Sequence, residues 1–232
     1  MTNAFVRKLL RGVDLTARDQ QRLIAATSRT ETIAPRVVLM REGELNDGGC
    51  VLLSGFATCS KLLTNGGRQI VAYRVPGDAD GLYGIHTEHL DYTVVTLTPC
   101  DVAFISRATI DDWLADSPGI ARALWWSLLT EKSYLCGSLT NIGQRPGAQR
   151  LAYLICELLS RLRAVGLERT GSFEVPLTYQ DFADILGFGE VHACRAFRQL
   201  REVGVLTDGR ASIVVTDVDR LKCFADFDLT CY

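Results

Sequence analysis

The 232-residue chain is 47% hydrophobic and 22% charged, the composition of a globular protein long enough for two modest domains. No apolar run reaches the roughly 18 residues of a membrane span, and the N-terminus lacks the apolar core of a signal peptide, so we expect a cytoplasmic protein. The formal net charge of −2 gives no sign of a strongly basic nucleic-acid binder. Any attraction to DNA must therefore come from a local group of basic residues.

The first half of the chain predicts a helix followed by a small β-domain. Thr16 and Asp19 have the spacing of a capping box, which marks the start of a helix. Short strand-like runs then alternate with turn signals such as Asn65-Gly66, which is typical of a small antiparallel barrel or roll. The runs span residues 37–40, 49–53, 56–63, 69–75, 93–97 and 102–105.

From about residue 110 the apolar period becomes helical. An a/d heptad stripe extends from Ala121 to Ile142 and is interrupted only by Lys132. The helix either lies on the β-domain or forms the seam of a parallel homodimer. For the second case the interface residues are Trp125, Leu128, Leu135, Leu139 and Ile142. Pro146-Gly147 ends the helix, and a further apolar helix face follows over residues 151–159.

Residues 177–207 predict two short helices joined by a tight turn. Thr178 and Asp181 form a second capping box, and Gly187 ends the first helix because glycine adopts the left-handed conformation at low cost. On the second helix Arg195, Arg198 and Arg201 recur three apart, beside an apolar face. This hairpin is either a surface element with a solvated charged face or a helix-turn-helix that enters a DNA groove.

The residues after the hairpin favour DNA binding. Two short strands, residues 205–206 and 212–215, flank the turn 207–211, which is how a wing is attached to a helix-turn-helix. Arg210 would lie at the wing tip, within reach of a phosphate. Residues 173–175 could pair as a third strand.

The whole chain resembles the catabolite activator/Fnr (Crp/Fnr) superfamily of bacterial transcription regulators. The runs that carry the resemblance are Pro76-Gly77-Asp78, residues 98–106, Asp116-Ser117-Pro118 and residues 177–195. The resemblance implies an α+β fold in three segments. These are an N-terminal cyclic-nucleotide-binding-like antiparallel β-roll (1–108), a dimerisation helix with a hinge (109–145) and a C-terminal winged helix-turn-helix (146–232).

The resemblance also implies how DNA would be contacted. Arg195 matches the arginine that contacts a base edge or a phosphate, and Arg198 matches the basic residue one turn later. Thr178 and Gln180 match positions that hold the DNA backbone and so set the register of the complex. The implied partners are a second copy of the chain, double-stranded DNA with a near-palindromic site, and RNA polymerase.

One pair in the second helix departs from the family pattern. The Arg-Glu pair that frequently precedes the reading arginine is replaced by Glu190-Val191, which implies a different operator. Glu190 and His192 are the candidates for the replacement contacts; both could equally be solvated residues of the helix surface.

The candidate effector pocket departs further. Members that bind cyclic nucleotides carry Gly-Glu-Leu and Arg-Ser in one loop, where this chain has Gly81-Leu82-Tyr83 and Leu90-Asp91. The adenine-contacting Thr-Ser pair on the long helix is replaced by Leu135-Cys136. Because a leucine replaces the guanidinium and a carboxylate lies where a phosphate would, we expect no response to cyclic AMP.

Other effectors remain as alternatives. His86 and His89 could ligate haem, and Cys136 could be a thiol switch, although it could equally be a small buried hydrophobe. An iron-sulfur cluster is disfavoured because no cysteine precedes Cys50, and the activity could also be set by abundance alone.

An enzyme is the alternative from another functional class. A metal-binding cupin-like site could use the two loop histidines with Asp80, Glu88 and Asp91, but the histidine spacing of such enzymes is missing. The eight cysteines contain no CxxC pair, and we find no catalytic triad or phosphate-binding glycine loop. We therefore expect no enzyme activity, no metal and no cofactor.

Overall fold

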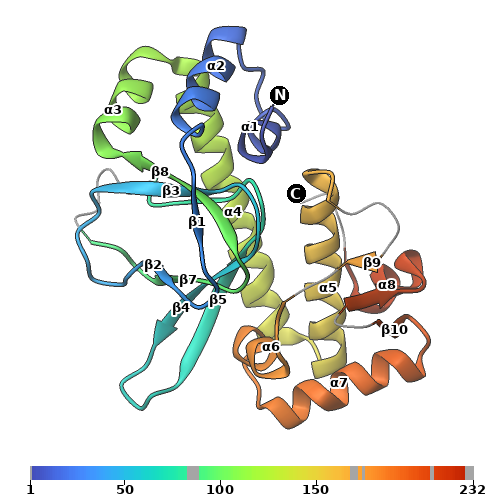
Figure 1. Cartoon of the computed structure of the whole chain (residues 1–232). Coiled ribbons are helices and arrows are strands. Elements are labelled where there is room, and N and C mark those ends of the chain that lie inside the picture. The colour runs from blue at the N-terminus through green and yellow to red at the C-terminus, as the bar shows by residue number, and fades with distance from the viewer. Residues whose placement is uncertain (1, 83–88, 168–171, 174–175, 210–211, 228–232) are drawn as a thin grey trace. The chain divides into compact units, whose positions relative to one another are not determined.

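The structure is a computed structural model that describes residues 2–82, 89–167, 172–173, 176–209 and 212–227 (Figure 1). By contacts the chain divides into two compact units. The first comprises Met1–Leu62 and Val71–Lys132, and the second comprises Leu63–Ile70 and Ser133–Tyr232. The three functional segments expected from the sequence stay a prediction.

Two four-stranded sheets form the β-roll, which confirms the predicted antiparallel fold. One sheet has the order β1 (Glu31–Ile33), β8 (Cys100–Ser106), β3 (Gly48–Leu52) and β6 (Ala79–Asp80). The other has the order β2 (Val38–Met40), β7 (Thr93–Thr96), β4 (Ala57–Leu62) and β5 (Arg68–Arg74). Leu39 and Met40 of the second sheet pack against buried residues of β3 and β8, so that both sheets share a core. The sequence patterns did not predict β1 or β6.

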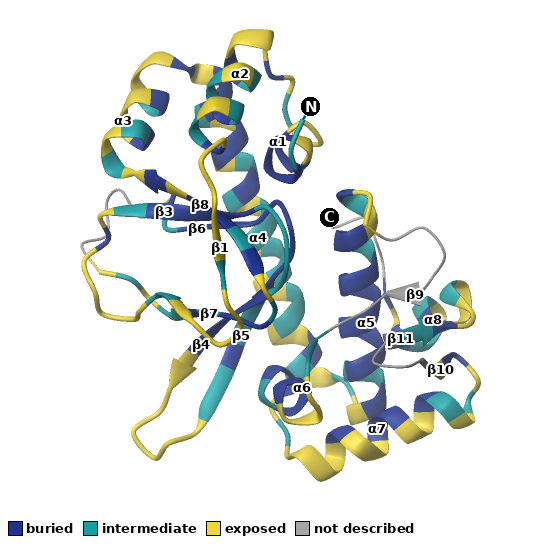
Figure 2. Ribbon diagram, viewed as in Figure 1, coloured by how far each residue is buried: buried dark blue, intermediate teal, exposed yellow. Residues whose placement is uncertain are grey.

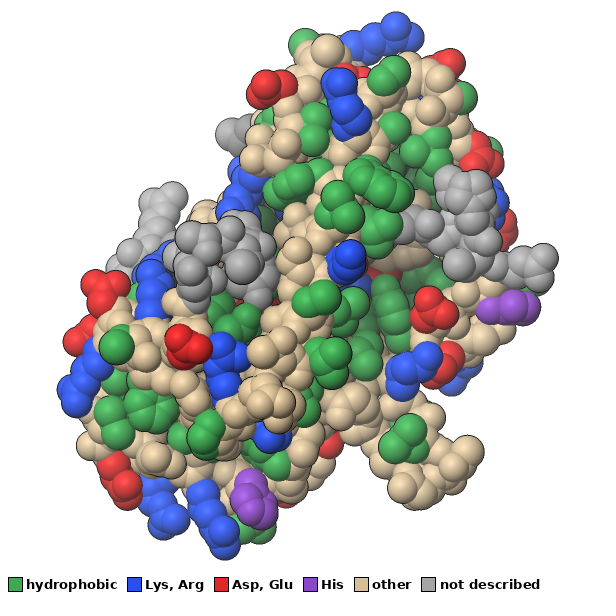
Figure 3. All heavy atoms as spheres, turned by 180° about the vertical axis from the view of Figure 1, so that it is seen from behind, with side chains coloured by type: hydrophobic (Ala, Val, Ile, Leu, Met, Phe, Trp, Pro, Cys, Tyr) green, Lys and Arg blue, Asp and Glu red, His purple; other side chains and the backbone are tan. Residues whose placement is uncertain are grey.

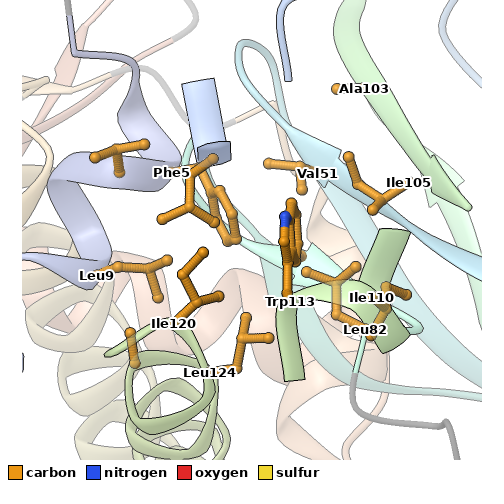
Figure 4. Packing of buried hydrophobic residues seen from close by; sticks show 14 of the residues in the cluster. Phe5, Leu9, Val51, Leu82, Ala103, Ile105, Ile110, Trp113, Ile120 and Leu124 are labelled. Atoms are coloured by element: carbon orange, nitrogen blue, oxygen red, sulfur yellow. The ribbon is translucent and has the colours of Figure 1, made fainter. Parts of the chain in front are cut away.

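Four helices surround one side of this core. They are α1 (Ala4–Leu9), α2 (Ala17–Ala26), α3 (Arg107–Asp116) and the first part of α4 (Pro118–Gln144), whose residues from Ser133 onward belong to the second unit. Figure 4 shows Phe5, Trp113, Ile120 and Leu124 meeting Val51 of β3 in the main hydrophobic cluster of the first unit. Trp113 is 1% exposed and Ile120 fully buried, and a side chain of this size contributes about 1.5–3 kcal/mol when buried.

Local signals explain where these helices begin. The Thr16 side chain accepts from the Asp19 amide at 3.1 Å, and the Asp19 carboxylate accepts from the Thr16 amide at 3.2 Å. This confirms the predicted capping box. Helical structure begins at Arg107, with Ser106 as its N-cap, and is interrupted at Ser117 before the long helix starts at Pro118. Proline suits the first turn of a helix because its missing N–H would have no intrahelical partner there.

The second unit contains the C-terminal helices and a three-stranded wing. Its helices are α5 (Gly147–Ala164), α6 (Tyr179–Leu186), α7 (Glu190–Glu202) and α8 (Val218–Ala225). Figure 2 shows α5 as mostly buried, and Leu151, Ile155 and Leu158 are fully buried. This confirms the apolar face predicted for residues 151–159. No helix in the described ranges is long and apolar enough to span a bilayer.

Candidate nucleic-acid interface

The helix-turn-helix is built from α6, a glycine turn and α7. The Thr178 side chain accepts from the Asp181 amide at 3.1 Å, and Asp181 accepts from the Thr178 amide at 3.0 Å. Gly187 ends α6 in the left-handed conformation with φ of 69°, where a side chain would be strained. The predicted capping box and helix stop are both confirmed.

The two faces of α7 differ sharply in burial. Ala193, Ala196, Phe197 and Leu200 are 5% exposed or less, and the Phe197 ring meets the Phe182 ring of α6 edge-on at 5.0 Å. The spacing of these four residues places them on one side of the helix. The opposite side is exposed along most of the length of α7, as Figure 2 shows in yellow. α7 is thus fixed to α6 by one face while the other stays accessible.

Two arginines stand on the exposed face without partners. Arg195 and Arg198 are exposed, and neither forms a hydrogen bond or an ion pair with any residue that the structure describes. Arg201 does not share the exposed, unpartnered position of the other two arginines, although the sequence spacing placed all three on one side of the helix. Its Nη2 donates to the Tyr179 hydroxyl at 3.3 Å, and its guanidinium lies 5.7 Å from the centre of the Phe197 ring. Arg201 therefore ties α7 to α6.

The predicted backbone-contacting residues lie at the start of α6. Thr178 and Gln180 are both exposed, one at the N-cap and one in the first turn. The Gln180 side-chain amide donates to Asp184 Oδ1 at 2.6 Å. This bond holds the Gln180 side chain along the helix, an arrangement that the sequence alone did not indicate.

The first turn of α7 carries the two candidates for the replacement contacts. Glu190 and His192 are exposed, and the His192 ring lies 6.4 Å from the Phe188 ring in the preceding turn. Gly189 supplies no side-chain cap, so the amides at this helix end lack the side-chain acceptor that Thr178 provides for α6.

The predicted wing is present. β10 (Leu206–Gly209) pairs antiparallel with β11 (Ser212–Val215), and β11 pairs with β9 (Ser172–Phe173). The third strand is therefore confirmed, with its start one residue earlier than predicted. The first strand is longer than predicted, because residues 207–209 of the expected turn pair with β11. Arg210, the predicted wing-tip residue, lies outside the described residues.

The exposed stripe of α4 differs in register from the predicted one. Trp125, Leu135 and Leu139 are 63%, 51% and 74% exposed, but Leu128 and Ile142 are half-buried. Figure 3 shows hydrophobic side chains along this face of the helix. One set of exposed residues recurs alternately four and three apart, at Trp125, Leu129, Lys132, Cys136, Leu139 and Gly143, and exposed Leu135 and Thr140 lie directly beside it. We call the six recurring residues the α4 stripe.

The candidate effector residues do not gather at one described cavity. A cavity of about 390 Å³ in the first unit is lined by Leu39, Met40, Glu44, Leu45, Asp47, Gly48, Gly49, Leu90, Phe104, Ile105 and Ser106. Of the six candidates only Leu90 is on this wall, and the wall includes two carboxylates but no lysine or arginine among the described residues. An anionic ligand would therefore meet like charge there.

The other effector candidates occupy different environments. Gly81 has φ of 76°, and a Cβ at this position would lie 2.5 Å from the Gly48 carbonyl oxygen. Leu82 is 1% exposed in the main core, whereas Asp91 is exposed. Leu135 and Cys136 are exposed on α4. Cys136 is therefore not the buried hydrophobe that was one of its two interpretations.

The structure describes some, but not all, of the residues proposed as haem or metal ligands. His89 Nδ1 lies 2.9 Å from the Gly43 carbonyl oxygen, and Asp80 is buried against Arg74. His86 and Glu88 lie outside the described residues. Within the described ranges, no group of three or more potential ligands is arranged to hold a metal ion.

Comparison with known proteins agrees with this architecture. A cyclic nucleotide-binding domain model matches residues 30–117, and a Crp-like helix-turn-helix domain model matches residues 149–224. The chain is a Crp/Fnr family regulator. The helix-turn-helix of this Crp/Fnr regulator is therefore a DNA-binding element, and its matched relatives are transcription regulators.

Individual relatives of this Crp/Fnr regulator are distant but extensive. The nitrogen fixation regulation protein FixK of Azorhizobium caulinodans is 25% identical over 203 residues, which cover 86% of this chain and 80% of that protein. The transcriptional activator FnrL of Cereibacter sphaeroides is 25% identical over 183 residues, covering 77% and 73%. The structure of FixK2 from Bradyrhizobium japonicum matches with a TM-score of 0.77 at 23% identity, covering 84% of this chain and 96% of that one.

Proposed function

We propose that this Crp/Fnr regulator is a homodimer that binds a near-palindromic operator in the cytoplasm and works without cyclic AMP or another cofactor. The observation that carries the DNA-reading part is the exposed face of α7. Arg195 and Arg198 project from a helix whose opposite face is buried, so no internal salt bridge must break before they meet DNA. A bidentate arginine contact to guanine contributes about 1–3 kcal/mol of discrimination.

The experiment is selection of bound sites from random DNA, followed by affinity measurements on the selected site and on scrambled DNA. In the Arg195→Ala variant we expect specific affinity to fall by about 5- to 150-fold, with little change on scrambled DNA. Arg18→Ala is the matched control, because Arg18 is also exposed but lies on α2 of the other unit. Unchanged specificity of Arg195→Ala would show that Arg195 does not read bases.

The α4 stripe supports the homodimer. A periodic row that includes Trp125 at 63% and Leu139 at 74% exposure is unusual for a surface that stays in water. Spacings of four and three residues are those of a two-stranded parallel seam. A two-fold partner would also place two copies of α7 for half-sites about 34 Å apart.

The dimer is tested by an aspartate placed in the stripe. We expect Leu139→Asp to sediment as a monomer, whereas Leu62→Asp stays dimeric, because Leu62 is 70% exposed but lies on β4. A short bis-maleimide should also link Cys136 to its copy across a parallel seam. Dimeric Leu139→Asp, or crosslinking that does not require Cys136, would place the interface elsewhere.

Independence from cyclic AMP is supported by the cavity and by the residues at the matched positions. The cavity that Leu90 lines contains Glu44 and Asp47, and Leu82 is committed to the hydrophobic core. Neither site offers a described cation for a phosphate.

We further propose that RNA polymerase is a partner, as the family resemblance implies. Co-sedimentation with polymerase on operator DNA tests this proposal.

A further inference from the structure

Five charged side chains meet in the interior of the first unit. They come from α1 (Lys8), β5 (Arg74), the turn after β5 (Asp78), β6 (Asp80) and α4 (Glu131), and they are between 4% and 15% exposed. We call these residues the ionic cluster. Arg74, Asp78 and Asp80 are close in the sequence, whereas Lys8 and Glu131 come from distant segments that the fold brings to them.

Each cation in the ionic cluster already has an aspartate partner. Lys8 Nζ lies 2.9 Å from Asp78 Oδ1, and Asp78 Oδ2 accepts from the Val75 amide at 2.8 Å. Arg74 Nε lies 2.9 and 3.0 Å from the two Asp80 oxygens, and Arg74 Nη2 lies 2.6 Å from Asp80 Oδ1. Both aspartates are thus held by direct charge-assisted hydrogen bonds.

Glu131 is the third carboxylate of the ionic cluster, in addition to the two aspartates that pair with Lys8 and Arg74. Its Oε2 is 3.5 Å from Arg74 Nη2 and its Oε1 is 4.0 Å from Lys8 Nζ, longer than the corresponding aspartate contacts. Oε1 is buried and has no hydrogen-bond partner among the described residues. Two cations face three carboxylates, so the cluster carries an uncompensated negative charge when Glu131 is ionised and none when it is protonated. A buried uncompensated charge is costly.

Two described neighbours of Asp80, Tyr92 and Cys59, do not offset this charge. Burial raises the pKa of the Tyr92 hydroxyl and of the Cys59 thiol, so both are neutral, and both lie against Asp80. Burial also raises the pKa of Glu131, an effect that Arg74 and Lys8 oppose and that Asp80 and Asp78 reinforce. The charge count, the contact lengths and the burial of the side chain therefore all favour the neutral form of Glu131.

We propose that Glu131 carries a proton in the folded protein, and that the ionic cluster is a proton-operated latch that holds α4 against the β-roll of the first unit. Undocking of α4 would expose Glu131 to water, where a carboxyl group ionises at neutral pH. Rising pH therefore favours the undocked or unfolded state, and falling pH favours the docked one. The latch does not depend on DNA binding, but it acts on the helix that carries the α4 stripe.

The test compares wild type with Glu131→Gln, an uncharged variant of nearly the same shape. Unfolding is measured from about pH 5 to about pH 8.5, above the ordinary carboxyl range. As pH rises, the folding equilibrium constant of wild type should fall relative to the variant by up to about tenfold per pH unit. The matched control is Glu44→Gln, whose carboxylate is 61% exposed and should follow wild type. Parallel pH profiles of wild type and Glu131→Gln, or a gap of opposite sign, would overturn the proposal.

A measurement on wild type covers the case in which Glu131→Gln does not fold. Carbon-13 NMR of the Glu131 carboxyl carbon, assigned through the backbone, reports its protonation directly. A carboxyl that remains protonated at about pH 6 supports the latch, because an ordinary glutamate is ionised there. Titration in the ordinary range near pH 4.3 would refute it.

Discussion

The two capping boxes offer a matched test of how local structure supports DNA binding. In α2 and α6 alike, a threonine hydroxyl accepts the aspartate amide at 3.1 Å and donates to the carboxylate at 2.7 Å. We consider Thr16→Ala and Thr178→Ala. Loss of an N-cap costs about 0.5–2 kcal/mol, which is up to about a thirtyfold change in the local opening equilibrium.

The structure predicts a larger effect at Thr178. Asp181 is 1% exposed and Asp19 is 7% exposed. Arg68 Nη2 donates to Asp181 Oδ1 at 2.6 Å, so removal of the threonine hydroxyl leaves Oδ2 in this drier place with the Thr178 amide as its remaining described donor. We expect about 2 kcal/mol for Thr178→Ala and about 1 kcal/mol for Thr16→Ala.

Native-state hydrogen exchange separates the two helices. Thr178→Ala should speed exchange of the α6 amides and leave α2 unchanged, Thr16→Ala should do the reverse, and Thr178→Ser should restore protection because it keeps the oxygen. DNA affinity should fall only in Thr178→Ala, since Thr178 begins the helix that we expect to meet the DNA backbone. Equal loss of affinity in both alanine variants would contradict this account and indicate a general loss of stability.

Three further results are expected. Cyclic AMP at millimolar concentration should change neither the melting temperature nor the DNA affinity, and a clear thermal shift would show that the candidate pocket retains nucleotide chemistry. Hydrogen bonds from Thr16 lower the pKa of Asp19. Burial opposes the lowering at Asp181, but hydrogen bonds from Thr178 together with the hydrogen bond and charge of Arg68 lower the pKa of that carboxyl. Both carboxylates therefore stabilise the fold at pH values above the unfolded carboxyl range, and this stability is lost as pH falls through their lowered pKa values. Asp181→Asn should make the loss of stability at acid pH less steep. An unchanged loss would show that Asp181 does not contribute to it. Leu158→Ala, in the buried face of α5, should lower the free energy of unfolding by denaturant by about 2–5 kcal/mol. Leu167→Ala, at a residue that is 53% exposed, should change this free energy by about 0.5 kcal/mol or less. Similar values for the two variants would contradict the assigned burial.

The sequence predicted those parts of the fold that depend on neighbours along the chain. The helix-turn-helix was predictable because Thr178, Asp181 and Gly187 act within a few residues of one another. β1 and β6 were not, since Glu31–Ile33 and Ala79–Asp80 each contain a single hydrophobic residue and so form no apolar or alternating run. Their pairing is set by β8 and β3.

Features that depend on distant contacts were not predictable in detail. A heptad count placed Leu128 and Ile142 in the dimer seam, which stays a prediction. In the single chain both are half-buried, whereas Leu129, which the count left out, is exposed. The free face of α7 lacks Arg201 because that side chain reaches the Tyr179 hydroxyl across the turn. The ionic cluster likewise joins residues that no local pattern links.

The sparse charge on α7 bears on how this regulator would search a genome. Affinity for arbitrary DNA comes almost entirely from phosphate neutralisation, and this chain offers an exposed pair, Arg195 and Arg198, on a molecule of net charge −2. We therefore expect its residence on unrelated sequence to be short and its salt dependence to be shallow. Bulk chromosomal DNA then sequesters few copies, so an operator can be filled at a low cellular copy number, with search by repeated three-dimensional encounter more than by long sliding.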